Sequence, residues 1–144
     1  MELIHSEGQL YTLNFKRGEE IISGLTDFLK NKNIRAGHIT GLGAASELTL
    51  AYYNIETKEY EKRQFTENVE ILSLLGNVGI KEKDALVVHM HGVFGKKDFS
   101  VFGGHVFALT VSGAGEIHLT ALQNEIRRAY DEETGLTLMD GLTQ

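Results

Sequence analysis

The sequence predicts an α+β domain: a mainly antiparallel β-sheet of about seven strands with one principal helix packed on a face. Two observations support this. A single segment near the start has helical periodicity, and strand signals follow almost without interruption from residue 36 to residue 122. The length of 144 residues, with 42% hydrophobic and 24% charged side chains, suits one globular domain spanning 1–144, and we find no linker or internal repeat.

The helix is expected to follow a first strand at 10–15. Its apolar face consists of Ile21, Ile22, Leu25, Phe28 and Leu29. Gly18 opens it, and Glu19 and Glu20 fall in its first turn, where the helix dipole favours negative charge. Lysines 30 and 32 fall in the last turn, and the segment 31–33 ends the helix.

The remaining elements are predicted to be strands. They cover 37–43, 47–53, 59–65, 69–78, 85–94, 99–102, 105–111 and 116–122, with 134–139 as a last strand or docking segment. Turns are expected at 54–57 and at 112–115. The long apolar segments 69–78 and 85–94 flank a charged loop, so we expect an antiparallel hairpin covered on both faces.

Composition excludes several classes of function. The chain has no cysteine, which removes disulfides, thiolate metal ligands, Fe–S clusters and a cysteine nucleophile. The net charge of −6 opposes phosphate attraction, and no basic run exceeds two residues (62–63, 96–97, 127–128), which we interpret as a solvated surface of mixed sign. No apolar stretch approaches the roughly 18 residues of a membrane span. We therefore expect a soluble, unprocessed, cytoplasmic protein.

Three histidines have the spacing of metal ligands. His89 and His91 lie two apart on one predicted strand, so their side chains share a face with Cα atoms roughly 6.5 Å apart. His105 follows the glycine pair Gly103-Gly104, whose small size would leave room for an ion. Three imidazoles with an open fourth position for water are typical of a catalytic-type Zn²⁺ site. The sequence thus predicts a zinc site, or one for another divalent transition metal.

Other candidate residues are weaker. Glu70 stands among apolar residues and is the candidate catalytic carboxylate, either as a proton acceptor near the metal or simply as an outward-facing strand residue. Gly41-Leu42-Gly43 lacks a third glycine and a following helix, so we interpret it as a strand bulge rather than a phosphate loop. No other cofactor motif is found. The remaining histidines, His5, His38 and His118, have no partners at ligand spacing.

Two known families carry histidines in a related pattern. Cupins place Glu three or four residues after the second His, where this chain has Phe94 and Gly95, so that match is poor. A better one spans residues 9–122. Its motifs are Gly18-Glu19-Glu20, Gly41-Leu42-Gly43-Ala44, Leu50-Ala51-Tyr52-Tyr53, the segment 69–77, His89-Met90-His91-Gly92 and Gly103-Gly104-His105-Val106. Together they resemble the plant and prokaryote conserved (PPC) domain.

The resemblance implies an α+β subunit assembled as a homotrimer, with a metal, typically zinc, held at the positions of His89, His91 and His105. Plant members join this domain to AT-hook motifs that bind DNA. The AT-hook core is Arg-Gly-Arg-Pro, whereas this chain has no proline and its one Arg-Gly pair, Arg17-Gly18, lies inside the predicted fold.

Two hypotheses follow from these observations. In the first, the protein is a metal-binding homotrimer whose three-histidine site binds a small molecule or activates water. In the second, it is a DNA-binding or transcription-associated module. The charge and the absent AT-hook favour the first, so we do not expect DNA or a membrane among its partners.

Overall fold

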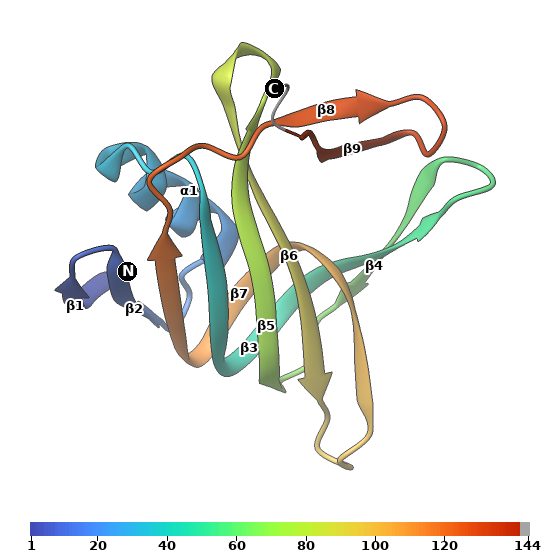
Figure 1. Cartoon of the computed structure of the whole chain (residues 1–144). Coiled ribbons are helices and arrows are strands. Elements are labelled where there is room, and N and C mark those ends of the chain that lie inside the picture. The colour runs from blue at the N-terminus through green and yellow to red at the C-terminus, as the bar shows by residue number, and fades with distance from the viewer. Residues whose placement is uncertain (142–144) are drawn as a thin grey trace.

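The computed structural model describes residues 1–141, and Figure 1 shows their arrangement. The elements are β1 Glu2–Glu7, β2 Leu10–Lys16, α1 Ile21–Lys32, β3 Gly37–Asn54, β4 Glu59–Phe65, β5 Val69–Lys81, a 3-10 turn Glu82–Asp84, β6 Ala85–Gly95, β7 Val101–Ala121, β8 Arg128–Asp131 and β9 Leu136–Met139. Seven strands form one antiparallel sheet in the order β1-β2-β7-β6-β5-β3-β4, and β8 and β9 pair separately. The predicted fold class is confirmed.

The two longest strands curl the sheet upon itself. β3 and β7 pair with each other from Gly37↔Ala121 to Ala51↔His105, while β5 and β6 also join them, so these four strands make a closed ring of pairings. The predicted breaks inside both strands were wrong, because 112–115 is not a turn and 37–43 continues into 47–53. Strand β1 at the edge was not predicted.

Gly43 on β3 lets the two long strands approach closely. Gly43 has φ 145°, which strains any other residue, and a Cβ there would collide with the carbonyl oxygen of Ala114. The register also shifts on both sides of Ala45. The interpretation of Gly41-Leu42-Gly43 as a bulged strand is therefore confirmed.

Helix α1 begins at Ile21, two residues later than predicted, because Glu19 and Glu20 precede its first turn. Glu20 is the N-cap, and its carboxylate accepts hydrogen bonds from the backbone N–H groups of Ile22 (3.0 Å) and Ser23 (2.6 Å). The same carboxylate accepts from the N–H of Leu109 on β7 at 2.9 Å, so the cap also fixes the helix to the sheet. Asn33 ends the helix in the left-handed conformation, as the 31–33 segment predicted.

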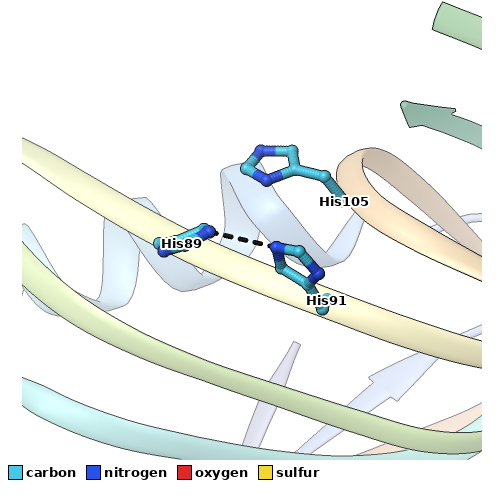
Figure 2. Close-up of side chains that lie close together, drawn as sticks. All are labelled: His89, His91 and His105. Atoms are coloured by element: carbon cyan, nitrogen blue, oxygen red, sulfur yellow. Dashed lines mark hydrogen bonds between the residues drawn. The ribbon is translucent and has the colours of Figure 1, made fainter. Parts of the chain in front are cut away.

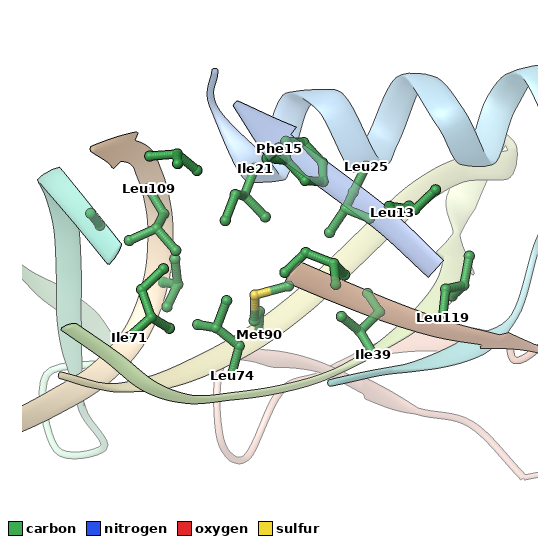
Figure 3. Packing of buried hydrophobic residues seen from close by; sticks show 14 of the residues in the cluster. Leu13, Phe15, Ile21, Leu25, Ile39, Ile71, Leu74, Met90, Leu109 and Leu119 are labelled. Atoms are coloured by element: carbon green, nitrogen blue, oxygen red, sulfur yellow. The ribbon is translucent and has the colours of Figure 1, made fainter. Parts of the chain in front are cut away.

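The core lies between α1 and the inner face of the curled sheet (Figure 3). Met90 and Phe94 of β6 are fully buried there. Because side chains alternate along a strand, the odd-numbered residues of this segment, His89, His91 and Val93, point to the opposite face of the sheet, away from the helix. The core thus fixes which face of β6 carries His89 and His91.

In the described chain, the outer face of the β5–β6 hairpin is covered only at one end, where β8 lies against it, contrary to the expectation that both faces would be covered. Leu72, Leu75 and Val93 are 53%, 61% and 42% exposed. We call these three residues the outer apolar patch. Leu72 and Leu75 lie on β5 and Val93 on the neighbouring strand β6, so they offer apolar surface for contact with another molecule.

The hairpin β8–β9 confirms the strand expected within 134–139 and lies beside β3 and β4 (Figure 1). The Tyr53 hydroxyl donates a hydrogen bond to the Thr134 carbonyl at 2.7 Å, and the Lys58 ammonium donates to the Glu132 carbonyl at 2.6 Å. These contacts hold the C-terminal hairpin across one end of the outer face. Among residues 1–141, no helix has both the length and the apolar character needed to cross a bilayer.

Candidate metal centre

The structure brings the three predicted ligands together on the outer face of the sheet (Figure 2). His91 on β6 is directly opposite His105 on β7 in the strand register, and His89 is two residues along β6. The ring centroids of His89, His91 and His105 are separated by 5.1, 5.0 and 5.2 Å, which is nearly an equilateral triangle. One nitrogen from each ring lies within 4.8 Å of the other two.

These separations suit a small ion bound by nitrogen. The Nε2 atoms of His89 and His91 are 3.2 Å apart. Two nitrogens that each lie about 2.0–2.1 Å from one tetrahedral Zn²⁺ ion would be about 3.3 Å apart. Imidazole ligands without carboxylates also favour zinc, nickel or copper over magnesium or calcium. The donor set therefore fits a transition metal.

The glycine pair before His105 also has a role in strand packing that was not predicted. A Cβ on Gly103 would collide with the carbonyl oxygen of Gly92 on β6, and a Cβ on Gly104 would come within 2.9 Å of the carbonyl oxygen of Ala51 on β3. The glycines therefore allow β7 to lie close to both neighbouring strands. This close packing places His105 opposite His91.

The electrostatic environment keeps two of the imidazoles neutral. Burial, reinforced by the neighbouring His89 and His91 and by Lys62, lowers the pKa of His105 to about 4. Burial also lowers the pKa of His89, and the nearby Arg128 cation acts in the same direction. A metal ion requires neutral imidazole, so neither ligand has to lose a proton to it at neutral pH.

A pocket of about 770 Å³ opens beside the histidines. Its walls include the aromatic rings of Tyr60 and Phe107, which lie 5.0 and 4.8 Å from the ring of His105. The hairpin β8–β9 supplies Arg128 and Leu136 to the same pocket. The volume lies within the roughly 300–1,000 Å³ of small-molecule sites, so the pocket can admit a ligand to the histidines.

Arg128 is the residue that sequence reasoning missed. We interpreted the basic pair 127–128 as solvated surface, but Arg128 is only 8% exposed. Its guanidinium donates hydrogen bonds to the Asn77 side chain (2.6 Å) and to the Thr137 carbonyl (3.0 Å), and it approaches His89 Nδ1 at 3.4 Å. Burial lowers the pKa of this group. No local pattern marks a buried arginine 37 positions after His91, so the sequence offered no signal for it.

The other candidates lie apart from the centre. Glu70 is exposed, pairs with Gly95 on β6, and lies five residues along β5 from the partner of His91, so the structure does not bring it to the histidines. His5 and His38 are exposed. His118 is also exposed, and its Nδ1 atom lies 3.2 Å from the Thr12 hydroxyl.

Comparisons with solved structures agree with this fold. A protein from Bacteroides thetaiotaomicron, whose name suggests DNA binding, is 34% identical, covers 94% of each chain and has a TM-score of 0.90. A metal-containing protein from Archaeoglobus fulgidus is 34% identical over 98% of this chain and 99% of its own, with a TM-score of 0.84. A plant- and prokaryote-conserved (PPC) protein from Pyrococcus horikoshii is 29% identical over 96% of each chain, with a TM-score of 0.84.

No curated protein matches the chain. The family model of the Plants and Prokaryotes Conserved (PCC) domain matches residues 4–123, which include all three histidines of the centre but not the hairpin β8–β9. This match confirms the resemblance found in the sequence. The chain belongs to the Plants and Prokaryotes Conserved domain family.

Proposed function

We propose that the protein binds a divalent transition metal, Zn²⁺ by preference, through His89, His91 and His105, and presents it to a small molecule in the adjoining pocket. The observation that carries the proposal is the triangle of three rings about 5 Å apart, with two Nε2 atoms at 3.2 Å. The metal-containing relative from Archaeoglobus fulgidus supports it.

The chemistry of the site divides between the ion and the chain. A bound divalent ion supplies a Lewis acid that polarises an oxygen atom of a ligand or lowers the pKa of water. The rings of Tyr60 and Phe107 pack beside the ring of His105 and give the pocket an apolar wall there. The phenol of Tyr60 is neutral at pH 7 and burial raises its pKa further, so it can donate a hydrogen bond to a ligand in the pocket.

Elemental analysis of matched variants tests the metal site. In His91→Ala, one of three protein ligands is lost from an exposed position, so the metal content should collapse while the fold survives. The matched control is His118→Ala, which removes an equally exposed strand histidine outside the centre and should retain the metal. Equal metal in the wild type and His91→Ala would refute the assignment.

We also propose that the protein assembles as a homotrimer through the outer apolar patch. Full burial of an exposed leucine or valine is worth about 1.5–3 kcal/mol, and these three are about half exposed, so covering them would contribute about half of that each and favour association. Light scattering should give about 48 kDa, three chains of 16.0 kDa. Leu75→Glu would put a charge on the most exposed residue of the patch and should reduce that mass. A wild-type mass of one chain at micromolar concentration would refute the trimer.

DNA binding is the alternative function, and it rests on the name of the Bacteroides relative. The net charge of −6 opposes attraction to phosphates, and counter-ion release supplies most non-specific DNA affinity. We expect no specific complex at physiological salt. A fluorescence anisotropy titration that gave specific binding tighter than about 10⁻⁷ M would favour this alternative over a purely small-molecule function.

A further inference from the structure

The buried arginine beside the candidate metal centre has a charge that the described chain does not neutralise. Arg128 is 8% exposed, and among residues 1–141 no carboxylate lies within 4.0 Å of its guanidinium. Its hydrogen bonds go to two neutral oxygens, and Nε has no partner within the part of the chain described. A buried cation without a counter-ion is unfavourable, so the site is suited to an anion.

The pocket carries positive charge, although the protein is acidic. Its charged lining residues are Arg128 and Lys81, and its described lining contains no aspartate or glutamate. In a chain with 20 acidic and 14 basic residues, this is a reversal of the overall charge. A cation held by the histidines would increase the positive potential further. Electrostatic complementarity therefore selects a negatively charged ligand.

The remaining walls of the pocket indicate the chemistry of the uncharged part of that ligand. Most of the pocket wall is apolar. It includes the side chains of Tyr60, Val87, Phe107 and Leu136. An apolar pocket with a few polar groups binds small organic molecules rather than a hydrated inorganic anion. The two terminal nitrogens of Arg128 each carry a second N–H beyond those that donate to Asn77 and Thr137, and these can donate charge-assisted hydrogen bonds to a carboxylate.

We propose that the pocket binds a small organic carboxylate, with its charge at Arg128 and its apolar body against Tyr60 and Phe107. This deepens the proposed function, because it names the ligand class of the same pocket. It also gives the hairpin β8–β9 a role in ligand binding, since Arg128 lies outside the matched family domain of residues 4–123.

The test compares one carboxylate with its neutral analogue. Mandelate carries a carboxylate on a phenyl-bearing carbon, and 1-phenylethane-1,2-diol has the same ring and hydroxyl without the charge. Calorimetric titration of the zinc-treated full-length protein should give a Kd below about 1 mM for mandelate and at least tenfold weaker binding of the diol. No mandelate binding in this range, or equal binding of the diol, would overturn the proposal.

Two neighbouring arginines provide a matched pair of variants. Arg128→Gln should weaken mandelate binding at least about tenfold, because a charge-assisted contact is lost. Arg127→Gln changes the adjacent residue, whose side chain is 61% exposed and pairs with Glu125, and should bind as the wild type does. Equal mandelate affinity in the two variants would contradict the role of Arg128.

A second readout requires no variant that could misfold. In ¹⁵N spectra of the wild type, mandelate should shift the Nε–H resonance of Arg128 while the diol leaves it unchanged, and no shift with bound mandelate would refute the assignment. Metal content is measured in every sample. If the wild type contains no metal, the proposed function is refuted but this inference is not. If the protein contains metal and binds mandelate equally well without Arg128, this inference is refuted but the proposed function is not.

Discussion

Acidification should weaken metal binding less than it would at a site of three histidines with the reference pKa. Three imidazoles with the reference pKa of about 6.5 would together lose about 3 × 10⁴-fold in affinity between pH 7.5 and pH 5, because each must shed a proton to bind the metal. The pKa of His105 is lowered to about 4, so this ligand is almost fully neutral at pH 5. A site with one such ligand and two reference imidazoles would lose only about 10³-fold.

The sign of the effect follows from the direction of the shift. A lowered pKa means that His105 takes up a proton only near pH 4, so its contribution to the loss appears there rather than near pH 6.5. The lowered pKa of His89 reduces the loss further. Zinc affinity should be measured by competition with a chelator calibrated at each pH, with His118→Ala as the control variant. A loss of the full 3 × 10⁴-fold by pH 5 would refute the argument.

Four further substitutions, one of them a control, test how the fold supports the site. Glu20→Ala removes the helix cap and leaves the Leu109 N–H without its acceptor, so urea unfolding should show a loss of about 1–3 kcal/mol. Gly43→Ala should lower the free energy of unfolding by at least about 1–3 kcal/mol, whereas Gly113→Ala, whose added methyl has room, should change it by less than about 1 kcal/mol. Tyr53→Phe should speed amide exchange in the hairpin β8–β9 without unfolding the sheet, because one anchoring hydrogen bond of about 1 kcal/mol is lost. Unchanged exchange there would show that the hydroxyl does not hold the hairpin.

The histidine cluster could be predicted because it depends on short-range rules. Alternation along a strand fixes that His89 and His91 share a face, and a short connection at 96–100 makes β6 and β7 neighbours. Helix α1 was likewise evident from its periodic apolar face. These features required no knowledge of contacts between distant segments.

The features that could not be predicted depend on tertiary contacts. The glycines at 113 and 115 give the same local signal whether the chain turns or a long strand bends, and only pairing with β3 decides between the two. The burial of Arg128 depends on how a C-terminal hairpin docks against β5, through Asn77. An apolar strand such as β5 also looks the same in sequence whether its outer face is covered by this chain or by another molecule.

The assignment of the metal centre can be tested by anomalous diffraction from crystals of the wild-type protein, purified without a chelator or a metal-affinity resin. We expect an absorption edge of a divalent transition metal, zinc by preference, and one anomalous peak per chain about 2.0–2.1 Å from a ring nitrogen of each of His89, His91 and His105. No peak at this position, or a peak ligated by other residues, would contradict the assignment.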